Sequence, residues 1–234
     1  APRWAPARSR AAHPVCGPPI LAAYEARLAG ASDEDPAAAQ YHQTLRKWFV
    51  TASQRRMEYT GRRVLREFVR HGTTTLEGRG GLSSDLRVEL KLLKALAAIQ
   101  NRPLDIVPVF STGYFPHGEA PEKYLQELVT HTLVELKRKS LARLVDLCCG
   151  PGGMTAEFAR PLAERVLELG IDLKFTLLPG ASLDVVEVAL ETHARSIDGL
   201  QSVGAQLAAR LAASPAVVTL LPGACFHWMA GAYP

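Results

Sequence analysis

The segment 143–178, RLVDLCCGPGGMTAEFARPLAERVLELGIDLKFTLL, constrains the fold more than any other part of the chain. Residues 144–149 form a short, mostly apolar run of strand length, and the glycine-rich turn GPGG follows it. Apolar residues then recur every three or four positions, at Phe158, Leu162, Val166 and Leu169, which predicts a helix that ends at Gly170. Residues 171–177 read as a second strand. Two strands joined through one helix are expected to lie parallel, in a right-handed unit.

The same alternation of strand and helix is predicted along most of the chain. Six strands are expected, at residues 73–77, 105–111, 143–149, 171–177, 196–200 and 216–222, and a seventh candidate lies near His13. Strict alternation implies a parallel sheet covered by helices, which is either a (β/α) barrel or an open doubly wound sheet. Because a complete eight-stranded barrel usually takes about 250 residues, a barrel built from these 234 residues would be short of its final unit.

Composition favours a soluble globular chain. Hydrophobic residues make up 47% and charged residues 21%, and no apolar run approaches the ~18 residues of a membrane span, so none is expected. The net charge of +4 permits contact with nucleic acid without requiring it, and a solvated basic surface also accounts for it. The four cysteines, Cys16, Cys148, Cys149 and Cys225, show no C-x-x-C spacing and are interpreted as reduced thiols.

Residues 1–24 are predicted to form a basic, proline-rich arm. They contain Arg3, Arg8 and Arg10, five prolines and no acidic residue. Such segments are typical of mitochondrial targeting sequences or of arms that lie on RNA, and an arm without a role is the simpler alternative. We therefore expect a mitochondrial location, with a cytoplasmic one as the alternative, and the three arginines are candidate RNA contacts.

The turn at residues 150–153 gives one functional hypothesis. VDLCCGPGG resembles the first motif of S-adenosylmethionine-dependent methyltransferases, in which a strand-end acid and a glycine turn let the backbone approach the cofactor. The next strand, IDLKFTLL, ends without the acidic residue that would hold the ribose. Because one glycine-rich turn after a strand is weak evidence, a methyltransferase ranks third among the functions considered.

A series of segments between residues 13 and 226 resembles imidazolonepropionase, the metal-dependent amidohydrolase of histidine degradation. The segments include HGTTTLEGRGG at 71–81, DLRVELKLLKALA at 85–97, the segment 143–178 and VVTLLPGACF at 217–226. The resemblance implies an α/β fold in which residues 25–234 form an incomplete, amidohydrolase-like (β/α) barrel of the TIM type, preceded by the arm at 1–24. It also implies that segment 143–178 supplies strands four and five with their helix, not a cofactor turn.

The resemblance implies a metal site whose ligands this chain mostly lacks. The family binds its metal through a His-x-His on the first strand, a histidine on the fifth strand and a late aspartate. His13 matches the second histidine, but Ala11 stands at the first and Thr176 at the fifth-strand position, and the late aspartate would lie beyond Pro234. The histidine usual on strand six falls on Gly199. Three protein ligands are the working minimum for such a metal, so no catalytic residue, metal site or cofactor is predicted; zinc or iron would be needed in the alternative of an active enzyme.

Two further positions bear on chemistry. The family's substrate-binding turn Lys-Ser-Gly-Tyr-Gly begins at Arg79 here and reads RGGLS, so those contacts are also missing. Cys149 and His117 are expected at the barrel mouth, where a nucleophilic pair is one hypothesis and a buried, apolar role for Cys149 is the simpler one.

The sequence therefore predicts a catalytically inactive, imidazolonepropionase-like pseudoenzyme. An incomplete barrel leaves an open sheet edge and uncovered helix faces, so a structural or interaction role in a larger assembly is expected, with protein partners. A mitochondrial, RNA-containing complex such as an organellar ribosome is one candidate assembly. The alternative is an active metal-dependent amidohydrolase that hydrolyses a cyclic amide.

Overall fold

Seven parallel strands form one sheet in the computed structural model, which describes residues 7–15, 25, 28–30, 44–45, 47–81, 83–101, 103–116, 120–200 and 203–223. Each strand pairs with its neighbours in sequence, so the order across the sheet is β1 to β7. The strands are β1 (Ala7–Ala12), β2 (Thr73–Arg79), β3 (Asp105–Ser111), β4 (Leu144–Cys149), β5 (Asp172–Leu177), β6 (Ser196–Asp198) and β7 (Val217–Thr219).

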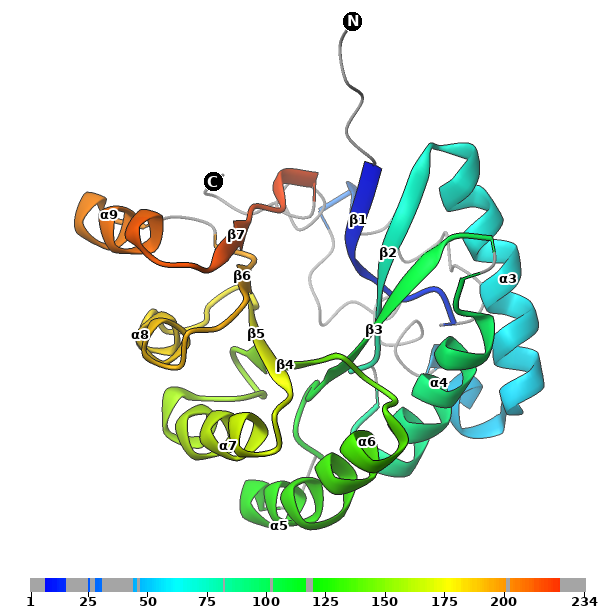
Figure 1. Cartoon of the computed structure of the whole chain (residues 1–234), viewed down its shortest axis with the longest axis horizontal. Coiled ribbons are helices and arrows are strands. Elements are labelled where there is room, and N and C mark those ends of the chain that lie inside the picture. The colour runs from blue at the N-terminus through cyan, green and yellow to red at the C-terminus, as the bar shows by residue number, and fades with distance from the viewer. Residues whose placement is uncertain are drawn as a thin grey trace, which may run out of the picture.

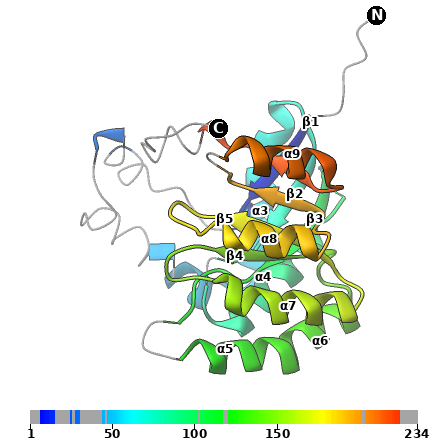
Figure 2. The same ribbon diagram turned by 90° about the vertical axis from the view of Figure 1, so that its left-hand side faces the viewer.

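The sheet curls around a central axis, and the helices lie along its outer side (Figure 1). They are α3 (Gln54–Arg70), α4 (Leu86–Ile99), α5 (Pro121–Glu127), α6 (Leu133–Lys139), α7 (Ala156–Glu168), α8 (Asp184–Glu191) and α9 (Ala205–Ala213), and a π-helical turn, Leu128–Thr132, joins α5 to α6. Turned by 90°, the helices after α4 follow one another along the side of the molecule (Figure 2). Within the described residues β1 pairs only with β2 and β7 only with β6, which makes the sheet a curled half-barrel. The predicted incomplete (β/α) barrel is confirmed.

The strand predictions are also confirmed, and the candidate near His13 is β1. This strand lies within the interval predicted as an arm, so the backbone of Arg8 and Arg10 belongs to the sheet, whereas Arg3 lies outside the described residues. The prolines of this interval flank the strand and do not interrupt it, and Arg8 lies opposite Thr75 in the parallel pairing with β2.

The loop between β2 and α4 is fixed by a buried carboxylate. Glu89 of α4 accepts hydrogen bonds from the backbone N–H groups of Gly81 (2.7 Å) and Ser83 (2.8 Å). Asp85 caps the same helix, because its Oδ1 accepts from the N–H of Arg87 at 2.9 Å. These bonds hold the carboxyl end of β2, and hence Arg79, in one position.

The two faces of the sheet differ in chemistry. Side chains alternate along a strand, and the face toward the helices carries buried apolar residues such as Leu76, Phe110, Leu147 and Phe175. The opposite, inner face carries polar and charged ones. No described helix is long and apolar enough to cross a membrane.

Candidate functional site

Charged and hydroxyl side chains on the inner face of the sheet are buried, except that Glu77 is partly exposed. We call them the inner-face network: Glu77 and Arg79 on β2, Ser111 on β3, Asp146 on β4, Lys174 and Thr176 on β5, and Asp198 on β6. Asp146, Lys174 and Asp198 have an exposed fraction of 0%. Barrel interiors are usually filled by branched apolar side chains, and buried charges persist only when they are paired. The burial of charged side chains in this network is therefore the feature of the molecule that needs an explanation.

Asp146 is the acceptor at the centre of one half of the network. Its carboxylate forms an ion pair with the guanidinium of Arg79 and accepts hydrogen bonds from the hydroxyls of Ser111 (2.9 Å) and Thr176 (2.8 Å). The Arg79 guanidinium also donates to the Thr176 hydroxyl at 2.6 Å. Thr176 thus accepts from one partner and donates to the other, which uses its only hydroxyl proton and one of its two lone pairs.

Lys174 organises the other half. Its ammonium, on a side chain with no exposure, forms ion pairs with Glu77 and with Asp198, the latter at 2.8 Å between Nζ and Oδ2. Neither carboxylate oxygen of Asp198 accepts a well-aligned hydrogen bond from a described residue. Nε of Arg79 likewise donates no hydrogen bond to a described residue. Two cations are therefore paired with three carboxylates inside the half-barrel, which leaves one carboxylate in excess.

His13 lies just after β1, beside the network. Its Nδ1 is 3.3 Å from the carbonyl oxygen of Arg79. Because a carbonyl can only accept, Nδ1 carries the proton and Nε2 keeps the lone pair. Burial, followed by the positive charge of Arg79, lowers the pKa of His13 to about 4. The ring is therefore neutral at pH 7.

The other positions implied by the family pattern hold no ligand. Ala11 lies in β1, and Thr176 lies in β5 between Asp146 and Arg79. Gly199 has a φ of +81°, and a Cβ there would overlap the carbonyl oxygen of Leu177, so no histidine fits at this position.

The described residues do not fit a divalent metal. Among them, no three histidine, cysteine or acidic side chains lie close enough together to share one. The guanidinium of Arg79 already neutralises Asp146, and its charge would repel a second cation in this low-dielectric interior. We therefore derive no metal-dependent step for this site.

Cys149 does not lie on the inner face, contrary to the expectation that it faces the barrel mouth. Alternation along β4 turns Asp146 and Cys148 inward and Cys149 toward the helices, where it joins the apolar core. Burial raises the pKa of both thiols, that of Cys148 to about 11. His117 lies outside the described residues.

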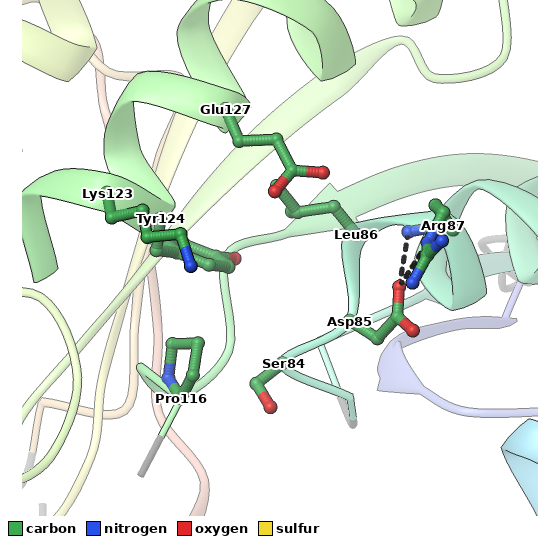
Figure 3. Close-up of a pocket in the computed structure, with 8 residues that line it drawn as sticks. All are labelled: Ser84, Asp85, Leu86, Arg87, Pro116, Lys123, Tyr124 and Glu127. Atoms are coloured by element: carbon green, nitrogen blue, oxygen red, sulfur yellow. Dashed lines mark hydrogen bonds and ion pairs between the residues drawn. The ribbon is translucent and has the colours of Figure 1, made fainter. Parts of the chain in front are cut away.

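A shallow hollow of about 470 Å³ lies beside the carboxyl ends of β2 and β3, between the first turns of α4 and α5 (Figure 3). Its charged residues, Asp85, Arg87, Lys123 and Glu127, are balanced in sign, and Asp85 is occupied as a helix cap. None of its lining residues belongs to the inner-face network, so the hollow adds nothing to that site.

Sequence reasoning identified His13 and Thr176 but missed Arg79, Lys174 and Asp198 as partners. The available signal was a charged residue inside a run of strand length, as in DLK at 172–174 or SID at 196–198. Such a residue must point inward or be exposed, and a parallel strand covered by helices offers few exposed positions.

Comparisons with known proteins identify the origin of the fold. No family model matches the chain. The imidazolonepropionase of Streptococcus pyogenes serotype M6 is 30% identical over 176 residues, which are 74% of this chain, and that of serotype M1 is 29% identical over the same length. The chain is a homologue of imidazolonepropionase. It spans 42% of the length of these relatives.

Solved structures agree on the fold of this imidazolonepropionase homologue. The N6-methyl-AMP deaminase of Arabidopsis thaliana matches 95% of the chain and 72% of its own, with a TM-score of 0.66 and 13% identity. The atrazine chlorohydrolase TrzN of Arthrobacter aurescens TC1, solved with zinc, matches 89% and 53%, with a TM-score of 0.56 and 12% identity. The half-barrel is thus amidohydrolase-like.

Proposed function

We propose that this chain is a catalytically inactive imidazolonepropionase-like protein that acts as a structural or interaction subunit of a larger assembly. The observation that carries the proposal is that Arg79 forms an ion pair with Asp146 and a hydrogen bond with Thr176, while Thr176 donates to Asp146. A hydrolytic metal needs about three protein ligands with free lone pairs and an open position for water. Here the hydroxyl at the fifth-strand position, that of Thr176, is hydrogen-bonded to both members of the Arg79–Asp146 ion pair. Arg79 beside it carries a permanent positive charge.

The inner-face network supports a structural role. A guanidinium has no lone pair, does not lose its proton, and holds a carboxylate in a fixed geometry. An Arg79–Asp146 pair that also binds two hydroxyls joins β2, β3, β4 and β5 without any bound cofactor. The proposal assigns to these side chains the task of cross-linking the sheet.

The sheet edges support the interaction role. In the part of the chain that the structure describes, β1 and β7 each pair on one side only. Two apolar side chains at or next to β7 are half-exposed, Val217 at 49% and Leu220 at 51%. An edge strand with unpaired backbone groups is a template for another chain, so we place the protein contact there.

Metal analysis combined with an activity assay tests the proposal. The purified chain, incubated with zinc or iron and desalted, is expected to retain substoichiometric metal and to show no turnover of imidazolone propionate. His13→Asn is the matched variant, and it is expected to change neither readout. One zinc or iron per chain, together with turnover that His13→Asn abolishes, would establish the alternative of an active amidohydrolase instead.

The proposed assembly has its own test. The arginine-containing, acid-free composition of residues 1–24 supports a mitochondrial location, although residues 7–12 of this segment form β1 and so belong to the folded sheet. Cell fractionation and size-exclusion chromatography of the endogenous protein should place it in mitochondria, in particles several times larger than a single chain. A protein that elutes as a free monomer from the cytosol would contradict both parts.

A further inference from the structure

Helix α3 concentrates the positive charge of the molecule. Its 17 residues, QRRMEYTGRRVLREFVR, contain six arginines and two glutamates. This excess of four positive charges equals the net charge of +4 of the entire chain. The rest of the sequence is therefore neutral overall, and the basic character belongs to one element.

The arginines gather on the side of α3 that faces away from the sheet. Arg55, Arg62, Arg66 and Arg70 recur at spacings of seven, four and four residues, which places them in one row, and Arg63 lies beside it. The opposite side of the helix buries Met57, Gly61 and Leu65. In Figure 1, α3 lies at the right-hand margin of the molecule, with α4 and β2 on its inner side. We call the outward side, with Arg55, Tyr59, Arg62, Arg63, Arg66 and Arg70, the α3 basic face.

Much of the charge on this face is not neutralised. Arg70 pairs with Glu67, and Arg62 donates to the carbonyl oxygen of Ala98. Arg55, Arg63 and Arg66 are exposed and have no ion-pair partner among the described residues.

Several surface arginines elsewhere have acidic partners, although Arg138 and Arg143 are exposed without one among the described residues. Arg160 pairs with Glu191, and Arg165 pairs with Glu168. Arg210 pairs with Glu187 through both of its terminal nitrogens. The arginines of α3 are distinguished by their number on one helix, with three unpaired ones on the same side of it.

An aromatic ring lies within the same face. Tyr59 is four residues from both Arg55 and Arg63, and 65% of its surface is exposed. A large exposed ring between arginines has two chemical uses: its face can stack on a nucleobase, and the guanidinium forks around it match phosphate oxygens. A row of separate cations along about 25 Å of helix suits a chain of phosphates better than a single anion.

We propose that the α3 basic face binds single-stranded nucleic acid. The arginines contact successive phosphates, and Tyr59 stacks on a base. An anionic membrane is a poorer match, because an interfacial helix needs an apolar face for the lipid, and α3 buries its apolar side against its own fold. The inference concerns the outer surface and does not depend on whether the inner-face network is inactive.

Fluorescence anisotropy with labelled oligo(U) RNA and oligo(dT) DNA tests the proposal. Binding is measured between about 0.05 and 0.3 M salt. The triple variant Arg55→Gln/Arg63→Gln/Arg66→Gln keeps good helix formers at exposed positions. Each lost phosphate contact lowers the slope of log K against log salt by about 0.7, so the variant should lose about 2 in slope and roughly 100-fold in affinity at 0.1 M salt. Tyr59→Ala should weaken binding about five-fold or more and leave the slope unchanged.

The control removes the same charge from the other side of the molecule. Arg160→Gln/Arg165→Gln/Arg210→Gln lowers the net charge equally but affects arginines on α7 and α9 that already have acidic partners. This control should bind like the parent chain, and circular dichroism should show that all variants are folded.

Equal losses in the two triple variants would mean that only net charge matters, which overturns the proposal. An unchanged slope in the α3 variant overturns it as well. So does binding of phosphatidylserine vesicles but not of oligonucleotides. Comparison of oligo(U) with oligo(dT) shows whether RNA or DNA is the preferred ligand.

Discussion

Removal of the Asp146 carboxylate should destabilise the fold more than most single substitutions. In Asp146→Ala the guanidinium of Arg79, whose side chain is only 6% exposed, would lose its ion-pair partner. The hydroxyls of Ser111 and Thr176 would lose an acceptor at the same time. Breaking one partner of a buried pair costs about 3–5 kcal/mol, because it leaves the other charge uncompensated. We expect a loss of about 4 kcal/mol, a large part of the 5–15 kcal/mol that stabilises a typical domain.

A double-mutant cycle separates the pair from its surroundings. Arg79→Met alone should cost about 3 kcal/mol and Asp146→Leu alone about 4 kcal/mol. The double variant Arg79→Met/Asp146→Leu removes both charges and should cost less than Asp146→Leu does. The free energy of unfolding is measured by urea titration, followed by circular dichroism at pH 7. Arg160→Gln/Glu191→Gln provides the control, since that pair is exposed to solvent and should show much weaker coupling.

Two results would refute this reasoning. The first is a cost of Asp146→Ala below about 1 kcal/mol, the value of a surface pair. The second is strict additivity in the cycle, which would mean that Arg79 and Asp146 act independently.

Three further predictions follow from the same structure. The folded-state pKa of His13 is lowered to about 4. Its contribution to the free energy of unfolding is therefore complete above pH 6.5 and is lost as the pH falls toward 4. We expect a loss of about 2 kcal/mol, which is below the full value of the pKa shift because the ring retains some contact with water. Urea titrations of the parent chain and of His13→Asn at several pH values isolate this contribution, and parallel pH profiles would contradict it. Cys148 and Cys149 should not react with a thiol reagent in the native state once the two cysteines outside the described residues are serine, and both should react in denaturant; rapid native labelling would show that they are not buried thiols with raised pKa values. Gly199→Ala should cost about 2 kcal/mol or more in thermal melts, since the residue has a positive φ and its Cβ would overlap Leu177. Gly223→Ala is the control and should be nearly neutral, because no atom lies within 4 Å of the added Cβ.

The order and direction of the strands could be predicted from the sequence because that information is local. The runs at residues 105–111 and 171–177 are apolar, of strand length, and bounded by turn residues. Each is followed by a helical pattern, and strict alternation leaves parallel pairing as the simple solution. The segment 7–12 was harder, since its composition is that of a tail and only its pairing with β2 makes it a strand.

The inner-face network could not be predicted, because it depends on register between strands far apart in sequence. Arg79 and Thr176 are separated by 97 residues, and so are Glu77 and Lys174. A shift of one residue in any strand would turn these side chains outward and apolar ones inward. The family pattern gave the positions of lost ligands, but it could not show that Arg79 contacts both Asp146 and Thr176.

The engagement of Thr176 with Arg79 and Asp146 has a consequence for the history of the chain. A single substitution that placed histidine at 176 would remove the hydroxyl shared by both partners and crowd a buried guanidinium. A change at Arg79 alone would leave the buried carboxylate of Asp146 without its ion-pair partner. Each first step toward a metal ligand set is therefore destabilising unless the others occur with it. Because the effects of these substitutions depend on one another, the network restricts the sequences that the chain can reach by single mutations.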